Sequence, residues 1–312
     1  MNHVLLISPD IVGPRMAGPG IRYWNFARSL ALRGFQVTLA TPNDFSPPPE
    51  TGFRCVRATG PEIQKVLGEV QVVVVQGLAL LHYPFLVGCN VPLVIDIYDP
   101  FILENLEARK DVPLGERLAL HDSDLGLLVQ QLQVGDFFIC ASEKQRDYWV
   151  GMMASLNRVN PLTYAEDESL RRLIDVVPFG LPDEEPVQTQ RVLKGVYPGI
   201  GINDKVLLWA GGIWDWFDPL TLIEAVSRVA EQRPEVKLFF MGTRHPATQT
   251  VTEMTRKAEE LSRKLGVLGR NVFFNDWVPY EERQNYLLEA DIGVSTYAEH
   301  LETRFSFRTR VL

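Results

Sequence analysis

The first forty residues constrain the fold most strongly. A short apolar run, His3–Ser8, predicts a β-strand; a loop rich in glycine and proline follows it, and then Ile21–Arg33 predicts a helix with one apolar face. Gly34 fits the position that ends many helices, and a second apolar strand is expected at Gln36–Thr41. A strand, a helix and a strand in this order predict the opening βαβ unit of a parallel α/β sheet.

The loop between the first strand and the first helix is a candidate anion site. Backbone amides of glycines before a helix start can approach a phosphate or a carboxylate, and the positive end of the helix dipole favours negative charge there. The spacing differs from the dinucleotide fingerprint G-x-G-x-x-G, and glycine also has steric uses in such turns, so both interpretations stay open. The candidate contacts to a phosphate or an acceptor are Arg15, Gly18, Gly20 and Arg22.

Strand and helix patterns alternate along the rest of the chain in two series. Between the series, residues 181–203 are rich in proline and glycine and keep no steady period, which is typical of a linker. We therefore expect an α/β protein of two doubly wound, Rossmann-like domains, 1–180 and 204–312, with ligands in a cleft at the carboxyl ends of the strands. The further strands are expected at Val70–Gln76, Pro92–Ile97, Asp136–Ala141, Lys205–Ala210, Val236–Met241, Val272–Asn275 and Asp291–Ser295.

The second series stops at Leu312, shortly after its last expected strand. A sheet that ended there would leave that strand as an exposed edge and the helix after it without a full groove to pack in. We therefore expect the second domain to be incomplete, as in a fragment of a longer protein.

Composition indicates a globular enzyme rather than a nucleic-acid-binding or membrane-spanning protein. The 312 residues are 46% hydrophobic and 22% charged, and a formal net charge of −8 argues against a nucleic acid as the main partner. No apolar run approaches the ~20 residues that span a bilayer, and the N-terminus lacks the signal-peptide pattern, so we expect a cytoplasmic protein. The three cysteines are too widely spaced for a disulfide framework or a zinc cluster, and no Asp-x-Asp motif stands in a suitable place, so we expect no metal site.

Short motifs in a definite order run through nearly the whole chain. They are Gly18–Arg22, Arg33–Val37, Pro92–Pro100, Cys140–Glu143, Val177–Leu181, Leu207–Gly212, Leu222–Ala225, Phe240–Gly242 and Ala290–Ser295. In this order they resemble the retaining, nucleotide-sugar-dependent glycosyltransferases of the GT-B fold, family 4 type. The resemblance implies transfer of a sugar from a nucleoside-diphosphate sugar to a hydroxyl of a glycan or lipid-linked acceptor, with retention of configuration. The donor is then a substrate, and no cofactor is implied.

Two positions that this family uses to clamp the donor diphosphate are uncharged here. Aligned on Leu222–Ala225, the family's arginine and lysine correspond to Gly212 and Phe217. Because a planar guanidinium and an ammonium are both missing, other groups must neutralise the diphosphate. The nearest candidates are Arg304, Arg308 and Arg310 near the chain end, and Arg15 and Arg22 in the first domain.

The family's pair of acidic residues is also absent in its usual form. The first would fall near Phe305, so Glu302 is the nearest carboxylate and our candidate for contacting the sugar, while the second would lie beyond Leu312. Asp99 closes a strand at the edge where the family binds the acceptor hydroxyl, which makes it the second catalytic candidate. Its alternative role is to cap the helix that follows Pro100.

The remaining donor candidates follow strand ends of the second domain. Gly211 and Gly212 would let a phosphate approach the backbone, or would only turn the chain. The resemblance places the nucleobase against the backbone at Trp277 and Val278, although the indole has the alternative role of covering the sheet end. Two further donor candidates lie in the loop after another strand, namely Gly242 and His245.

Rival interpretations remain open at this stage. A catalytically silent GT-B-like binding protein would suit the missing clamp, and a sugar-nucleotide epimerase would need a cluster of acids and histidines that the sequence does not display. Trp214, Trp216 and Phe217 predict domain packing or, if exposed, an aglycone or lipid contact. Many relatives work at membrane surfaces, so peripheral association with the inner membrane also stays open.

Overall fold

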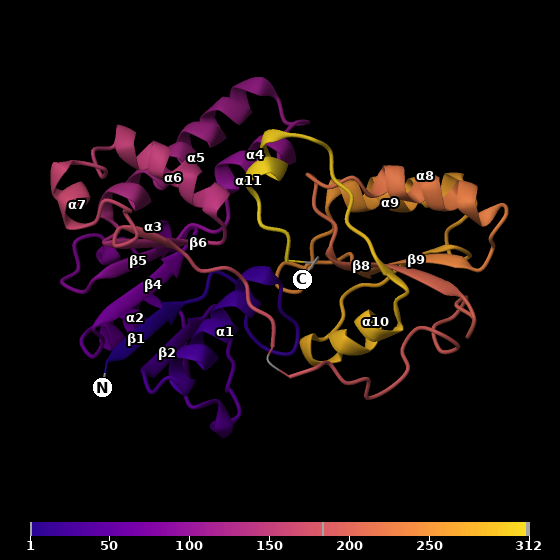
Figure 1. Ribbon diagram of the computed structural model, residues 1–312, viewed down its shortest axis with the longest axis horizontal. Coiled ribbons are helices and arrows are strands. Elements are labelled where there is room, and N and C mark those ends of the chain that lie inside the picture. The colour runs from indigo at the N-terminus through magenta and orange to yellow at the C-terminus, as the bar shows by residue number, and fades with distance from the viewer. Residues whose placement is uncertain (1, 183, 310–312) are drawn as a thin grey trace. The chain divides into compact units, whose positions relative to one another are not determined.

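The computed structural model describes residues 2–182 and 184–309, and these divide into two compact units (Figure 1). Unit 1 comprises residues 2–13, 18–180 and 304–307. Unit 2 comprises residues 14–17, the described residues of 181–303, and 308–309. The passage that the sequence suggests as a linker therefore groups with unit 2.

Unit 1 is built on a parallel sheet of seven strands in the order β3-β2-β1-β4-β5-β6-β7. The register is regular: Val4 of β1 lies opposite Val37 of β2 and Val72 of β4. Because helices cover both faces of a parallel sheet, its strands are apolar nearly throughout. The strands are β1 (His3–Ile7), β2 (Gln36–Thr41), β3 (Arg54–Arg57), β4 (Val72–Gln76), β5 (Leu93–Asp96), β6 (Phe137–Cys140) and β7 (Ile174–Val176).

The helices of unit 1 follow the predicted alternation. The first helix begins at Gly18, earlier than predicted, so the glycines of the loop form its first turn. Gly34 has a φ of 84°, which confirms the predicted helix end. Leu5, Ile95 and Trp149 are fully buried in the core. The helices are α1 (Gly18–Leu32), α2 (Gly60–Leu67), α3 (Ala79–His82), α4 (Phe101–Ala108), α5 (Leu114–Val134), α6 (Glu143–Ser155) and α7 (Pro161–Glu166), with 3-10 turns η1 (Pro49–Thr51) and η2 (Pro84–Leu86).

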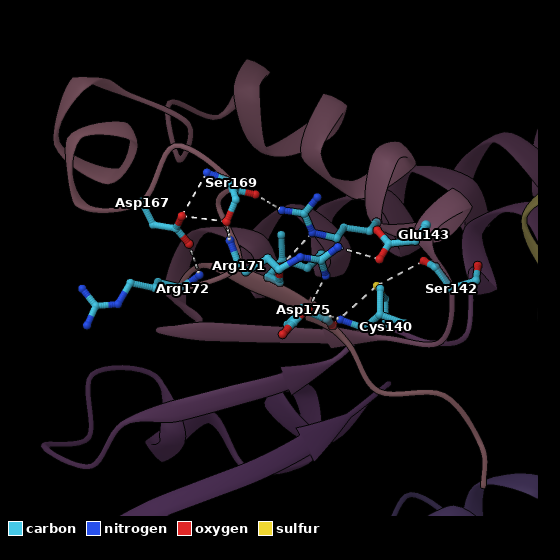
Figure 2. A network of polar contacts seen from close by, with 11 residues as sticks. Cys140, Ser142, Glu143, Asp167, Ser169, Arg171, Arg172 and Asp175 are labelled. Carbon is cyan, nitrogen blue, oxygen red and sulfur yellow. Dashed lines mark hydrogen bonds and ion pairs between the residues drawn. The ribbon is translucent and has the colours of Figure 1, made fainter.

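A network of polar contacts at the surface of unit 1 joins β6, α6 and β7 (Figure 2). Ser142 caps α6 by accepting a hydrogen bond from the Gln145 amide at 3.2 Å. Glu143 pairs with Arg171 at 2.6 Å, and Arg171 also pairs with Asp175 of β7. All three charged side chains are about half exposed, so we assign this part of the family-like motif to local structure, where such pairs contribute little stability.

Unit 2 has a smaller parallel sheet in the order β10-β9-β8-β11. Trp209, Phe239 and Phe240 are fully buried against it. Strand β11 pairs with β8 alone within the described part of the chain, and its Ile292 is 57% exposed, as an edge strand allows. The elements are β8 (Lys205–Gly212), α8 (Pro219–Ala230), β9 (Val236–Gly242), α9 (Glu253–Lys264), β10 (Val272–Phe274), η3 (Tyr280–Glu282), α10 (Arg283–Glu289), β11 (Ile292–Gly293) and α11 (Leu301–Phe305).

Side chains of helix α10 hold the passage before β8 by hydrogen bonds to its backbone. The buried carboxylate of Glu289 accepts hydrogen bonds from the amides of Val192 (2.7 Å), Leu193 (3.0 Å) and Lys194 (2.7 Å). One turn earlier, the buried Asn285 accepts from the Thr189 amide at 2.8 Å. The passage lacks regular secondary structure, so these side chains satisfy backbone donors that no helix or sheet would satisfy.

Asp291 joins the same passage to two strands. Its carboxylate accepts from Lys194 Nζ at 2.7 Å, from the Val206 amide at 2.8 Å and from Lys205 Nζ at 3.3 Å. Partial burial opposes ionisation, but these donors and the lysine charges outweigh it and lower the pKa of Asp291 to about 2.

We predict that Asp291→Asn destabilises unit 2 in a pH-dependent way. An unfolded aspartate has a pKa of about 3.9, so the lowered native pKa stabilises the fold above that pH, and this contribution disappears as the pH falls from about 4 to 2. After a discount for solvent screening we expect a loss of about 1 kcal/mol at pH 7. Urea unfolding followed by tryptophan fluorescence between pH 7 and pH 3 measures it.

The matched control is Asp276→Asn, because the Asp276 side chain is 76% exposed and its nearest cation, Arg244, lies 3.6 Å away. This variant should unfold with the wild type throughout the pH range. A difference between wild type and Asp291→Asn that stayed constant from pH 7 to pH 3 would show that the charge of Asp291 is not what stabilises the site.

Candidate functional site

In both sheets the strand order reverses beside the first strand of the series. The reversal lies between β1 and β4 in unit 1, and between β8 and β11 in unit 2. Loops leave the two central strands in opposite directions at such a point, and ligands of open α/β sheets bind outside the carboxyl ends of the strands there. These two edges are therefore where ligand-binding residues are expected.

At the edge of unit 1, Arg22 of α1 forms a buried ion pair with Asp96, the last residue of β5. Arg22 Nε lies 2.7 Å from Asp96 Oδ2, Nη2 lies 3.1 Å from Oδ1, and Nη2 also donates to the Val177 carbonyl at 2.8 Å. Arg22 is 2% exposed and Asp96 1%. Burial raises the pKa of Asp96, while Arg22 and the Tyr98 amide oppose this shift. Asp96 is therefore a buried acid whose two oxygens are both hydrogen-bonded to Arg22.

Aromatic rings enclose the Arg22 guanidinium. Its carbon lies 4.5 Å from the centre of the Phe26 ring, 4.8 Å from that of Tyr98 and 5.0 Å from that of Phe179. Burial raises the pKa of the Tyr98 hydroxyl, which interacts with Gln76, the register partner of Asp96 on β4. Within the described residues, three buried atoms of this region have no hydrogen-bond partner: Arg22 Nη1, the Tyr23 hydroxyl and Gln76 Oε1.

The other candidates of unit 1 lie nearby in sequence but differ in setting. Gly18 and Gly20 form the first turn of α1, which carries no acidic residue, so backbone amides and the helix dipole are directed at any anion there. Asp99 is half-buried and does not cap α4, because Pro100 takes the N-cap position without a side-chain hydrogen bond. Arg15 is exposed and groups with unit 2, whereas Gly18, Gly20 and Arg22 group with unit 1.

In unit 2, tryptophan rings cover two of the candidate glycines. A Cβ atom on Gly242 would come within 2.7 Å of the Trp277 ring, and one on Gly212 within 3.3 Å of the Trp214 ring. Gly211 lies at a register irregularity between β8 and β9. Its φ of 137° is a backbone conformation that residues with a side chain rarely adopt. Tryptophan packing and backbone conformation are therefore sufficient reasons for glycine at these strand ends.

The same rings form a strip along the carboxyl edge of the sheet. Trp214 stacks on Trp216 with ring centres 5.8 Å apart and planes 13° apart, and His245 lies 5.7 Å from Trp214 and 6.2 Å from Trp277. These four side chains, which we call the aromatic strip, are all partly exposed, whereas the neighbouring Val278 is 4% exposed. The strip therefore exposes ring surface at this edge of the sheet, and the donor roles of His245 and Trp277 stay predictions.

Glu302 and Arg308 form the second buried ion pair, in unit 2. Glu302 Oε2 accepts from Arg308 Nη2 at 2.6 Å, and the two side chains are 0% and 12% exposed. The Arg308 guanidinium lies 4.9 Å from the centre of the Phe217 ring and 5.4 Å from that of Tyr297. Two buried polar atoms near the β8/β11 reversal, Arg308 Nε and Ser295 Oγ, have no hydrogen-bond partner in the described part of the chain.

The structure thus brings Glu302 and Arg308 together within unit 2. Arg304 is exposed beside Phe305 and belongs to unit 1, and Arg310 lies outside the described residues. The sequence interpretation missed His300, which contacts both the Trp216 carbonyl and the Glu302 region. The only sequence signal for His300 was its position two residues before Glu302, the candidate acid.

A search of the described residues finds no group of three or more His, Cys, Asp and Glu side chains placed to hold a metal ion. Within the same residues, no helix is both long and apolar enough to cross a bilayer. Among the described residues, the features of the two candidate edges are two buried ion pairs, helix and strand ends, and the aromatic strip.

Several solved structures share this architecture with the chain at low sequence identity. A sucrose-phosphate synthase from Thermosynechococcus elongatus is 15% identical, with a TM-score of 0.58 over 96% of this chain and 77% of the other. A trehalose 6-phosphate synthase from Burkholderia multivorans is 12% identical (TM-score 0.51, 95% and 76% covered), and an alpha-glucosyltransferase solved with UDP is 11% identical (TM-score 0.50, 99% and 77% covered). No family model and no curated protein matches the sequence.

These similarities identify the fold as that of the GT-B glycosyltransferases, with two Rossmann-like units, and the predicted fold class is confirmed. The family 4 type and the retention of configuration remain predictions from the sequence.

We predict that breaking the Arg22–Asp96 pair destabilises unit 1 strongly. Arg22→Met leaves a buried carboxylate without its cation, which typically costs about 3 kcal/mol or more, whereas the double variant Arg22→Met/Asp96→Leu should recover most of the loss. Urea unfolding compares the free energies of unfolding.

The control on the same helix is Arg28→Met, because Arg28 is exposed and its replacement should change stability by less than about 0.5 kcal/mol. Equal losses for Arg22→Met and the double variant would mean that the ring contacts of Arg22, rather than the carboxylate, determine the stability of this edge.

Proposed function

We propose that the chain is a glycosyltransferase that moves a sugar from a nucleoside-diphosphate sugar to a hydroxyl of a glycan or lipid-linked acceptor, with retention of configuration. The observation that carries the proposal is the buried Glu302–Arg308 pair in the unit of a GT-B fold whose sheet reverses between β8 and β11. A carboxylate and a guanidinium cation near this reversal support the proposal, because α/β units bind their ligands at such edges.

The leaving diphosphate needs positive charge, and Arg308 is the best-placed source. Gly212 and Phe217 carry no charge, but the Arg308 guanidinium lies 4.9 Å from the Phe217 ring and so restores a cation beside that position. Its Nη2 atom is bound to Glu302, while its Nε atom has no partner among the described residues and can donate to a phosphate oxygen.

The nucleobase and the phosphates of the donor would bind along the same carboxyl edge of the unit 2 sheet. We propose that the backbone at Val278 reads the nucleobase, that Trp277 and His245 of the aromatic strip pack against it, and that the turn at Gly211 and Gly212 lies near the phosphates. The UDP in the similar glucosyltransferase structure makes UDP-sugars the first donors to test.

The proposed chemistry needs no general base. The anomeric C–O bond to the diphosphate breaks, the acceptor oxygen forms the new bond on the same face of the sugar, and the leaving phosphate takes the acceptor proton. Arg308 stabilises the negative charge of the leaving group, and Glu302 binds a sugar hydroxyl. In unit 1, Asp99 would orient the acceptor hydroxyl, and the first turn of α1 at Gly18 and Gly20 would bind an acceptor phosphate.

A second candidate function, a catalytically silent protein that binds the nucleotide sugar, is favoured by one observation. Glu302 neutralises Arg308, so the pair brings no net charge to the diphosphate. Binding of a donor without transfer to any hydroxyl acceptor would support this candidate. For either function we propose a cytoplasmic protein that can associate peripherally with the inner membrane, where lipid-linked acceptors of polysaccharide biosynthesis would be found.

We predict that one of a panel of UDP-, GDP- and ADP-sugars binds the chain and that Arg308→Gln weakens this binding at least tenfold. The reason is loss of a charge-assisted hydrogen bond, which is typically worth about 1.5–3 kcal/mol. Isothermal titration calorimetry measures the dissociation constants. Arg304→Gln is the matched control, because Arg304 is exposed, and should change binding less than threefold.

Failure of every donor in the panel to bind would overturn the proposal. Equal weakening by the two arginine variants would instead mean that general positive charge, rather than the buried Arg308, holds the diphosphate.

We further predict that transfer does not depend on a divalent metal, because Arg308 and backbone amides supply the positive field that the leaving diphosphate requires. Product formation from the bound donor, followed by mass spectrometry, should be unchanged within twofold after treatment with EDTA. Recovery of activity only on addition of magnesium or manganese would contradict this assignment.

A further inference from the structure

We infer that His300 is a positioning residue for the Glu302–Arg308 pair, an inference that rests on the proposed donor site and names what holds its acid in place. His300 lies two residues before Glu302, and its side chain is 14% exposed. It makes polar contacts on both ring nitrogens, to two different parts of unit 2.

The partners of the ring determine its chemical state. Nε2 lies 3.2 Å from the Trp216 carbonyl, which can only accept, so Nε2 carries a hydrogen and donates. Nδ1 lies 3.2 Å from the Thr303 amide, which can only donate, so Nδ1 carries no hydrogen and accepts. Both contacts are satisfied together only by the neutral Nε2–H tautomer.

The first contact connects two loops of the candidate edge. Trp216 belongs to the loop that follows β8, whereas His300 belongs to the segment that follows β11, and these two strands flank the reversal of strand order. The Asp218 amide and the Thr296 carbonyl, 3.1 Å apart, hold the same two segments together. His300 thereby holds the turn that carries Glu302 next to the loop that follows the glycine turn at the end of β8.

The second contact orders the turn that carries Glu302. His300 precedes α11 and accepts from the amide of Thr303, as an N-cap side chain does. The Thr303 hydroxyl lies 3.0 Å from His300 Nδ1 and 3.3 Å from Glu302 Oε2, so the cap and the acid share a neighbour. Nδ1 itself lies 3.6 Å from Glu302 Oε2 and has no hydrogen to offer, so it does not compete with Arg308, which donates to that oxygen at 2.6 Å.

Two variants separate the two contacts. In His300→Asn the amide oxygen can still accept from the Thr303 amide, but the shorter side chain cannot reach the Trp216 carbonyl. His300→Gln places an NH₂ donor near that carbonyl but loses the cap. His300→Ala removes both contacts.

The test is a double-mutant cycle on the ion pair, which needs no ligand. The variants Glu302→Gln, Arg308→Gln and their double are unfolded in urea in the wild-type and the His300→Ala backgrounds, with tryptophan fluorescence as the signal. We expect the Glu302–Arg308 coupling to be at least tenfold in the unfolding equilibrium constant with His300 present, and less than twofold with His300→Ala. His300→Asn and His300→Gln should each retain an intermediate coupling.

A control for simple loss of stability is Ser262→Ala, which removes a buried hydrogen bond to the Ala258 carbonyl at 2.8 Å in α9. It should lower stability and leave the coupling unchanged. An unchanged coupling in His300→Ala would overturn the inference, as would a tautomer other than neutral Nε2–H in the ¹⁵N spectrum of the histidine-labelled wild-type protein at pH 7. The spectrum decides the matter if a cycle variant does not fold.

Donor binding distinguishes this inference from the proposed function. If the wild type binds a UDP-sugar, His300→Ala should raise its dissociation constant at least tenfold, and His300→Asn should restore part of the affinity. If no donor binds while the coupling still depends on His300, the proposed function fails and the positioning role stands. If a donor binds equally well to wild type and His300→Ala with unchanged coupling, the positioning role fails alone.

Discussion

Both sheets of this protein reverse their strand order beside the first strand of the series, and the rest of the site depends on this constraint. In unit 1 the reversal directs the loops after β1 and β4 apart, and in unit 2 it does the same for β8 and β11. A parallel sheet covered on both faces leaves its carboxyl edge as the surface where loops can differ freely. The polar residues discussed here gather at these edges because the faces of the sheets are filled with apolar side chains.

Each edge contains one buried arginine–carboxylate pair, but the two pairs differ in what they leave unsatisfied. Arg22 is enclosed by three aromatic rings and bound by both oxygens of Asp96, so its main effect is to fix α1 against β5. Arg308 binds one oxygen of Glu302 with one nitrogen, and its Nε atom keeps unused donor capacity within the described chain. Arg22 also has one unpartnered nitrogen, Nη1, but both oxygens of its carboxylate and three rings hold it. Arg308 is held by one nitrogen–oxygen contact and is therefore better suited to exchange partners with a ligand.

Local patterns predicted much of the fold but little of the site. Gly34 and the strands of both sheets follow from glycine positions and apolar runs, because these signals act within a few residues. The Arg22–Asp96 pair joins positions 74 residues apart, and no local pattern contains that information. The sequence offers Gly242 as a donor candidate, and only the structure shows that the Trp277 ring lies where a side chain at this position would be.

The sequence points to Glu302 and to Arg308 on different grounds, and their roles at a donor site stay predictions. Glu302 was named because it is the nearest carboxylate to a family position, whereas Arg308 was one of several arginines near the chain end. The structure places Arg308 against the buried acid and the Phe217 ring, all within unit 2. A flat ring supports the face of a guanidinium, whereas an ammonium at the position of Phe217 would repel it. The position of Arg308 thus depends on a ring and a carboxylate that come from two other segments of the same unit.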